Sequence, residues 1–278
     1  MRVESHPRQS QAISLVVCCT AAWSTALALQ RFGWTHATLQ GAGLCLGVAL
    51  LIGSLRAGTW AAALVGGLLM AAMYGATVAQ PDGPWWVSAI PPLLLLLVLT
   101  LLATRFRRYT KEHAGLGESR RGRSAAQVCA NLGIAALAAT FAWIPGARTL
   151  ALLGMTAAFV EATADTLSSE IGQAIRGRTI LLTTGQCISP GTDGGMSIAG
   201  TLAGICGSLL VAAACQSAMQ LTMHGTLIAW FAGLAGWMFD SLLGATLEHR
   251  GLLGNNAVNF CSTAFAAALA ALIGLWAR

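Results

Sequence analysis

Apolar stretches of about 20 residues, interrupted by short segments that carry arginine, occupy most of this chain of 278 residues. A stretch of that length is what a helix needs to cross the hydrocarbon core of a bilayer. Charged residues make up only 9% of the sequence, whereas soluble globular proteins carry roughly a quarter. The chain therefore cannot cover a water-facing surface. This excludes a soluble enzyme and predicts an integral membrane protein.

The spacing of these stretches predicts an all-α, polytopic membrane helix bundle with about nine transmembrane helices. The second and third stretches are separated by little more than Arg56, so they form either two spans or one re-entrant hairpin. The expected spans are residues 11–30, 37–55, 57–79, 85–104, 124–143, 149–171, 194–219, 225–247 and 257–277.

The distribution of cations predicts the orientation, because cytoplasmic loops of membrane proteins are enriched in lysine and arginine. With nine spans and a cytoplasmic N-terminus, thirteen of the sixteen cations fall on the inner side and three on the outer side. The inner cations are Arg2, Arg8, Arg56, Arg105, Arg107, Arg108, Lys111, Arg120, Arg121, Arg123, Arg176, Arg178 and Arg250, and the outer ones are Arg31, Arg148 and Arg278. Since these arginines sit between apolar stretches, they indicate topology in a bacterial inner membrane rather than binding to nucleic acid.

The same pattern divides the chain into three parts. Residues 1–104 form a group of about four transmembrane helices, and residues 105–123 form a basic cytoplasmic loop. Residues 124–278 form a bundle of about five helices that carries the polar motifs. Any active site is therefore expected in the last part, on the cytoplasmic face.

Acidic residues are scarce, and six of the ten follow residue 160. Ionisable groups within spans are costly, so they usually mark a pathway or a site. Glu161 and Asp165 are four residues apart and would share one helix face. Two such carboxylates make half of a divalent-cation site. The alternative is a pair of acids that balances Arg176 and Arg178 at the helix end.

Residues 189–197 read Ser-Pro-Gly-Thr-Asp-Gly-Gly-Met-Ser and lead into an apolar stretch. A glycine-rich loop at a helix N-terminus presents free backbone N–H groups to an anion, so Gly194 and Gly195 are candidate phosphate-binding residues. No Gly-Lys-Ser/Thr follows, so this is not a P-loop. The alternative is a turn followed by a helix cap.

Asp240 and Ser241 lie near the inner end of the eighth expected span. A carboxylate here would complete a cation site begun by Glu161 and Asp165, because magnesium favours a few carboxylates together with phosphate and water. The alternative is that Asp240 is hydrogen-bonded to hydroxyl groups of neighbouring helices.

Two further polar segments border expected spans. Arg121 and Arg123 precede a helix that carries Asn131; arginines at this position suit lipid head groups or a polyphosphate, or they are topology signals alone. Asn255 and Asn256 are expected to cap the last helix.

Five motifs occur in a fixed order, and together they resemble one integral membrane family. They occupy residues 120–131, 161–172, 190–195, 240–246 and 255–259. The family contains human transmembrane protein nineteen and the chloroplast phytyl-phosphate kinase of plant tocopherol salvage, and the resemblance covers residues 115–262. Leu167 and Asp193 depart from the pattern, in which tryptophan and asparagine are expected.

The resemblance implies a membrane-embedded kinase that transfers a phosphoryl group from CTP or another nucleoside triphosphate to an isoprenyl monophosphate such as phytyl phosphate. Glu161, Asp165 and Asp240 would bind Mg²⁺, and Arg121 and Arg123 would neutralise developing charge, so that Asp165, Asp240, Arg121 and Arg123 form the catalytic set. The expected substrate- and nucleotide-binding residues are Asn131, Ser169, Glu170, Thr192, Asp193, Gly194, Gly195, Ser241, Asn255 and Asn256.

The expected partners are the isoprenoid monophosphate lipid, the nucleotide and membrane lipids, with a homo-oligomer left open and no nucleic acid. Two other functions remain as alternatives. One is a transporter of ions or a small anionic solute, because acids within spans also mark such pathways. The other is a lipid-phosphate cytidylyltransferase, which would use the same metal and nucleotide.

Overall fold

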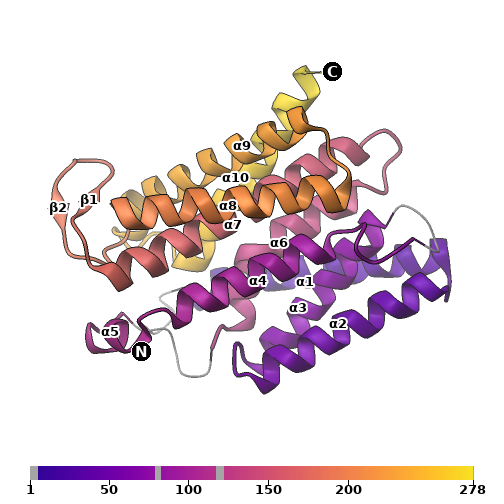
Figure 1. The fold of residues 1–278 in the computed structure, drawn as a ribbon, viewed down its shortest axis with the longest axis horizontal. Helices are drawn as coiled ribbons and strands as arrows, with labels where there is room; N and C mark the ends of the chain where they lie inside the picture. The colour runs from indigo at the N-terminus through magenta and orange to yellow at the C-terminus, as the bar shows by residue number, and fades with distance from the viewer. Residues whose placement is uncertain (1–5, 79–82, 117–121, 278) are drawn as a thin grey trace.

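The computed structural model describes residues 6–78, 83–116 and 122–277, and its helices run side by side along the long axis of the molecule (Figure 1). Each of the nine predicted stretches contains an apolar helix. These helices are α1 (Pro7–Phe32), α2 (His36–Ser54), α3 (Trp60–Thr77), α4 (Ile90–Arg105), α6 (Ala125–Phe141), α7 (Arg148–Ile175), α8 (Ile198–Met219), α9 (Met223–Leu243) and α10 (Asn255–Trp276). A short helix, α5 (Arg108–His113), follows α4, and a π-helical turn, η1 (Gly244–Glu248), extends α9.

The prediction of an all-α, polytopic membrane bundle is confirmed. Within the described residues, 7 helices are long and apolar enough to cross a membrane. The other two apolar helices, α4 and α6, have 16 and 17 residues, about 24–26 Å at 1.5 Å per residue, and so lie at or below the lower limit of about 17 residues for a membrane span. Both α2 and α3 reach the required length, which favours two spans over a re-entrant hairpin.

Hydroxyl side chains fix the starts of five helices. Each one accepts a hydrogen bond from the backbone N–H three residues ahead, which satisfies one of the donors that a helix leaves unpaired at its N-terminus. These N-cap residues are Thr35, Thr59, Ser124, Ser197 and Thr222. At α6 the cap is reciprocal, because the side chain of Gln127 also accepts from the backbone N–H of Ser124 at 2.7 Å.

A small antiparallel sheet lies where the sequence predicted only a loop. Strands β1 (Thr179–Leu181), β2 (Cys187–Ile188) and β3 (Gly195–Ser197) pair in the order β2-β1-β3. The prediction that residues 189–197 lead directly into a helix is confirmed, since Ser197 is the N-cap residue of α8, which begins at Ile198. The expected start of that span at residue 194 is wrong, because residues 195–197 pair with β1.

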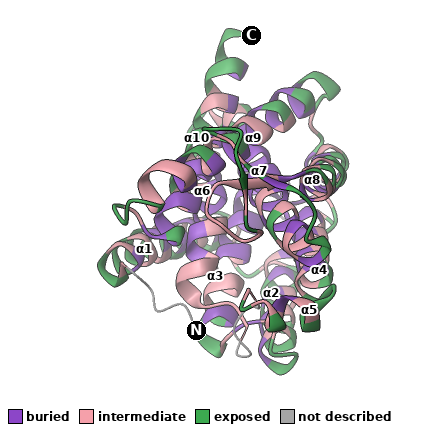
Figure 2. Ribbon diagram, turned by 90° about the vertical axis from the view of Figure 1, so that its left-hand side faces the viewer, coloured by how far each residue is buried: buried purple, intermediate pink, exposed green. Residues whose placement is uncertain are grey.

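Helix α7 is the centre of the bundle and contacts α4, α6, α8, α9 and α10. Figure 2 shows it surrounded by other helices and coloured mostly as buried. Small residues allow the close approach. A Cβ on Gly204 of α8 would lie 2.8 Å from the backbone oxygen of Ala164 in α7, and such small-residue contacts are how membrane helices pack tightly. The acidic residues Glu161 and Asp165 of α7 are thus held inside the bundle.

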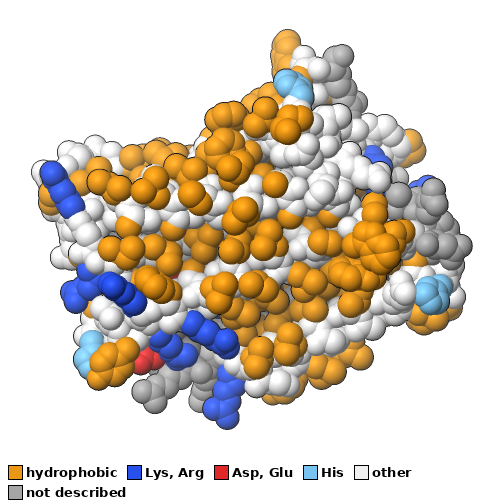
Figure 3. Space-filling model, in the orientation of Figure 1, with side chains coloured by type: hydrophobic (Ala, Val, Ile, Leu, Met, Phe, Trp, Pro, Cys, Tyr) orange, Lys and Arg blue, Asp and Glu red, His pale blue; other side chains and the backbone are white. Residues whose placement is uncertain are grey.

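Lysine and arginine side chains gather at the end of the molecule where α5 lies, while apolar side chains cover its body (Figure 3). Contacts between distant segments define this end: Thr59 bonds the backbone of Arg123, and Gln9 bonds that of Leu252. At the opposite end, Arg148 donates to two backbone oxygens at the end of α3. The two ends agree with the predicted separation of cations; which of them faces the cytoplasm stays a prediction.

Candidate functional site

Three helices bring two carboxylates onto one hydroxyl group. The Oγ of Ser262 in α10 lies 2.6 Å from Oε1 of Glu161 in α7 and 3.0 Å from Oδ2 of Asp240 in α9. The carboxylate of Asp165, one turn after Glu161, interacts electrostatically with both. We call Glu161, Asp165 and Asp240 the carboxylate cluster. The structure thus brings Glu161 and Asp240 together, with Asp165 one turn further along α7, and these are the three residues that the sequence predicted as metal ligands.

A glycine makes this convergence possible. A Cβ on Gly236 of α9 would lie 2.6 Å from Cβ of Ala266 in α10 and 3.0 Å from Cγ of Glu161. The three helices can therefore meet at this level only if the residue has no side chain. The sequence analysis missed Ser262, although a polar residue three positions after Asn259 in an apolar stretch was a usable signal.

The carboxylate cluster carries more negative charge than its immediate partner can neutralise. Glu161 is 1% exposed, and a hydroxyl group has a single proton to donate. Ser262 can therefore donate a hydrogen bond to one carboxylate at a time. A cation or added protons must balance the remaining negative charge. Carboxylate oxygens suit Mg²⁺, which commonly binds one or two of them together with water and substrate phosphates.

The cluster does not form a complete metal cage. Within the described residues, no group of three or more His, Cys, Asp and Glu side chains is arranged to hold a metal ion by itself. The donor set fits a cation that takes its remaining ligands from phosphate and water. The metal-binding role of Glu161, Asp165 and Asp240 stays a prediction.

The cluster lies deeper than the helix ends at which the sequence placed its acids. Glu161 is fourteen residues before the end of α7, about 21 Å along the helix. Asp240 is eight residues before the end of η1, and Ser262 is seven residues after the start of α10, about 10–12 Å from those ends.

A cavity of about 420 Å³ opens beside the cluster, between α2, α3, α4, α6 and α7. Its walls are mainly apolar and include Ile52, Met70, Leu93, Leu97 and Leu132. Four arginines line it toward the charged end of the molecule, and we call them the arginine mouth. They are Arg56, Arg105, Arg108 and Arg123. The cavity is therefore amphipathic, with a cationic entrance and an apolar interior.

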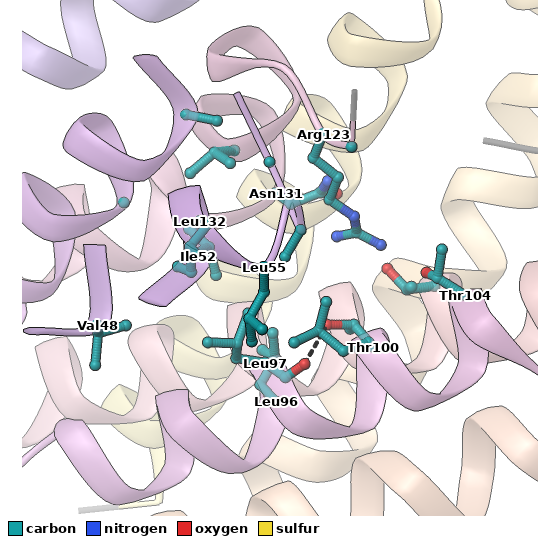
Figure 4. A pocket seen from close by; sticks show the side chains of 18 of the residues that line it. Val48, Ile52, Leu55, Leu96, Leu97, Thr100, Thr104, Arg123, Asn131 and Leu132 are labelled. Atoms are coloured by element: carbon teal, nitrogen blue, oxygen red, sulfur yellow. Dashed lines mark hydrogen bonds between the residues drawn. The ribbon is translucent and has the colours of Figure 1, made fainter. Parts of the chain in front are cut away.

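Arg123 joins the cavity to the carboxylate cluster. Its backbone is fixed to the turn between α2 and α3, since its N–H donates to the oxygen of Ala57 at 3.2 Å and its oxygen accepts from Thr59 at 3.0 Å. Its guanidinium points into the cavity toward Thr104 (Figure 4) and interacts electrostatically with Asp165. The sequence had paired these two residues only through their shared role in the predicted catalytic set.

An asparagine pair lies beside Arg123. Asn131 of α6, which lines the cavity next to Arg123 (Figure 4), accepts a hydrogen bond of 2.8 Å from Nδ2 of Asn259 in α10. Asn255 donates in turn to Oδ1 of Asn259 at 3.4 Å. Two predicted binding residues, Asn131 and Asn255, are thus linked through a third amide. The prediction that Asn255 and Asn256 cap α10 is wrong, because Gly254 is the N-cap residue and both asparagines lie within the helix.

A buried ion pair holds Glu170, which the sequence assigned to nucleotide binding. Lys111 of α5 is 2% exposed and forms a salt bridge with Glu170. It also donates to the backbone oxygens of Ala103 and Thr104 at 3.0 and 2.9 Å. The sequence analysis counted Lys111 only as a topology signal. In the structure its side chain connects the end of α4 to α7.

The glycine-rich loop is a turn between strands rather than an open anion cradle. The N–H of Gly195 donates to the oxygen of Thr192 at 3.0 Å, so the prediction that it is free to hold phosphate is wrong. Gly194 has a φ of +74°, and a Cβ there would lie 2.5 Å from the backbone nitrogen of Ala245. The loop is therefore docked against η1, a few residues after Asp240.

The remaining predicted residues occupy varied positions. Ser169 is exposed, Ser241 is buried and Asp193 is half-buried. The hydroxyl of Thr192 donates to the oxygen of Ser189 at 2.8 Å, and Asn256 donates to Ser10 of α1 at 2.9 Å. Arg121 lies outside the described residues.

The sequence of the whole bundle matches one family model. Residues 25–267 match the family described as integral membrane protein DUF92. The chain belongs to this family. It is an integral membrane protein with several membrane-spanning helices, and no solved structure matches it.

Proteins similar to this chain occur in archaea, bacteria and plants. A membrane protein of Methanocaldococcus jannaschii is 36% identical over 44% of this chain and 51% of its own length, and one of Synechocystis is 33% identical over 60% and 66%. The chloroplast protein VTE6 of Arabidopsis thaliana is 28% identical over 95% of this chain and 75% of its own length. The chain thus spans between about half and three quarters of each relative.

Proposed function

We propose that this protein is a membrane-embedded kinase that converts an isoprenyl monophosphate to the diphosphate, with CTP or another nucleoside triphosphate as phosphoryl donor. One observation carries the proposal: an apolar cavity within the bundle ends in an arginine mouth, and Arg123 links this mouth to the carboxylate cluster. This is the arrangement that an amphipathic phosphate ester requires. The motifs that resemble the phytyl-phosphate kinase family support it.

The acceptor binds with its tail between the helices and its phosphate at the arginine mouth. The guanidinium of Arg123 suits a phosphate group because its planar N–H donors can make two parallel hydrogen bonds. Apolar side chains of α2, α3 and α4 exclude water around the tail. A phosphate held beside Arg123 is thereby brought close to Asp165.

The donor nucleotide approaches from the charged end. Phosphoryl transfer depends mainly on positioning and on neutralising charge. When bound by the carboxylate cluster, Mg²⁺ supplies positive charge to the phosphates of the nucleotide. Arg123 neutralises charge on the acceptor side, and Asn131 is placed to donate or accept a hydrogen bond beside it.

The reaction needs no general base. A phosphate monoester is largely ionised near neutral pH, so one of its oxygens attacks the γ-phosphorus directly. The new bond joins that oxygen to the γ-phosphorus, and the bond from the γ-phosphorus to the β-bridging oxygen breaks. The products are the isoprenyl diphosphate and the nucleoside diphosphate. We place the site on the cytoplasmic face of the bacterial inner membrane, where nucleoside triphosphates are available.

The test uses purified protein, Mg²⁺, and phytyl, geranylgeranyl or farnesyl monophosphate with CTP labelled at either the γ- or the α-phosphate. We expect the γ-label to appear in the lipid diphosphate and the α-label to remain on the nucleotide. Transfer of the α-label to lipid, with release of diphosphate, would instead show a cytidylyltransferase. The absence of any lipid product, together with solute uptake by proteoliposomes, would replace the kinase with a transporter.

A further inference from the structure

The cavity continues well beyond the arginine mouth. Two of its lining residues, Arg105 at the mouth and Leu93 in the interior, lie on the same helix α4 and are twelve residues apart. At 1.5 Å per residue this separation is about 18 Å. Met70 of α3, 2% exposed, also lines the cavity. The cavity is thus an elongated channel, about 18 Å long from the mouth to its inner end, rather than a shallow groove.

Three glycines, Gly58, Gly66 and Gly122, line the cavity, and of these three Gly66 alone has room for a side chain. Gly66 lies midway along α3 between two other lining residues, Ala62 and Met70. A Cβ built on Gly66 would meet only Cγ1 of Val128, at 3.9 Å, which is ordinary van der Waals contact. Several glycines elsewhere in the bundle are required by close packing, as Gly236 is, but Gly66 faces space.

We propose that this channel selects the acceptor by the length of its tail, that Gly66 keeps its middle open, and that Met70 and Leu93 limit its depth. The proposal rests on the kinase function above and names a property of the same site. An isoprenoid tail gains free energy for each apolar group that it buries, so a tail that fills the channel binds best. A tail that must pass a narrowed channel is excluded, because overpacking is also unfavourable.

The test compares Gly66→Leu with Gly43→Leu. Gly43 is an exposed residue of α2 that lines a separate, open hollow beside Trp85 and not the channel, and no atom lies within 4 Å of a Cβ built on it. It therefore provides the same substitution at a site with equal room. Geranyl, farnesyl and geranylgeranyl monophosphate are the acceptors. Turnover and the rise in Tm caused by each lipid are both measured, since a ligand that binds the folded state raises Tm.

We expect Gly66→Leu to lower kcat/KM for geranylgeranyl monophosphate by about tenfold or more and to remove the corresponding rise in Tm. In the same variant, kcat/KM for geranyl monophosphate should change by less than about threefold. For Gly43→Leu, kcat/KM should match that of the wild type for all three lipids. Met70→Ala should shift the preference toward longer tails. Gly66→Ala, which adds only an ordinary contact, is the milder variant if the leucine disturbs folding.

Failure of the two proposals can be told apart. An equal loss of kcat/KM for all tail lengths, or an unchanged tail preference in both the Gly66 and the Met70 variants, overturns the length selection but not the kinase function. If the wild type forms no diphosphate from any lipid but the Tm shifts depend on tail length as expected, the kinase function is overturned and the channel is still a site that selects tails by length. If no lipid raises the Tm of the wild type, the channel is not a tail site.

Discussion

Glu161 and Asp240, which come from different helices, share the single hydroxyl group of Ser262. The same hydroxyl also lies 3.0 Å from the backbone oxygen of Asn259, so three acceptors compete for one proton. Close helix packing fixes this arrangement, because Gly236 has no side chain and so lets α9 approach Glu161 and Ala266, which a Cβ at this position would overlap. The bundle therefore holds two carboxylates close together in a buried place, where a divalent cation can stabilise them.

The first prediction concerns Asp240→Asn, which keeps the shape of the side chain and removes its charge. Turnover should fall by about a hundredfold or more, as when a charge-stabilising group is lost from an active site. The protein should remain folded, with an unchanged or higher Tm, because one of the repelling charges is gone. Mg²⁺ should raise the Tm of the wild type but not of the variant. Equal Mg²⁺ shifts in both proteins would remove Asp240 from the metal site.

The second prediction concerns Arg123→Gln. The backbone bonds of Arg123 to Ala57 and Thr59 remain, so the fold should be kept while the cation at the cavity is lost. We expect kcat/KM for the isoprenyl monophosphate to fall by about two orders of magnitude or more, because bonds between charged groups are the strong ones. Arg178→Gln, at an exposed position near the same end, is the control. Comparable losses in both variants would indicate a general effect of surface charge.

The third prediction separates stability from catalysis at the Lys111–Glu170 pair. Lys111→Met leaves Glu170 without its partner in a largely buried place and should cost about 3 kcal/mol of stability. The double variant with Glu170→Gln removes both charges and should recover most of that loss, as measured by unfolding in detergent. If Glu170 also binds nucleotide, the double variant will be stable but inactive; full activity would make the pair purely structural.

The course of the helices was predictable because it depends on local hydropathy. Runs of apolar residues and the arginines between them specify α1 to α4 and α6 to α10 without knowledge of their contacts. The spacing of Glu161 and Asp165 likewise predicted one helix face. These features depend only on neighbours along the chain.

The parts that sequence reasoning missed depend on contacts between distant segments. Ser262 matters because α10 meets α7 and α9 at its level, and Lys111 because α5 folds back on α4. The three strands have only two or three residues each, so they give almost no periodic pattern. A usable signal was nonetheless present, since Thr-Ile-Leu-Leu-Thr-Thr before Gly185 is typical of a strand that enters a turn.

The last prediction concerns the docking of the glycine-rich loop on η1 and uses two glycines with similar backbones. Gly194 and Gly185 have φ values of +74° and +66°, so alanine is strained at both. A Cβ on Gly185 meets nothing within 4 Å, whereas one on Gly194 would lie 2.5 Å from the backbone of Ala245. Gly185→Ala should therefore lower the free energy of unfolding by about 1 kcal/mol, from backbone strain alone. Gly194→Ala should lower it by clearly more, because the overlap with Ala245 is added to the strain. Because η1 continues the helix of Asp240, Gly194→Ala should also raise the Mg²⁺ concentration needed for half-maximal turnover, while Gly185→Ala leaves it unchanged. The same Mg²⁺ requirement in both variants would show that the loop does not support the carboxylate cluster.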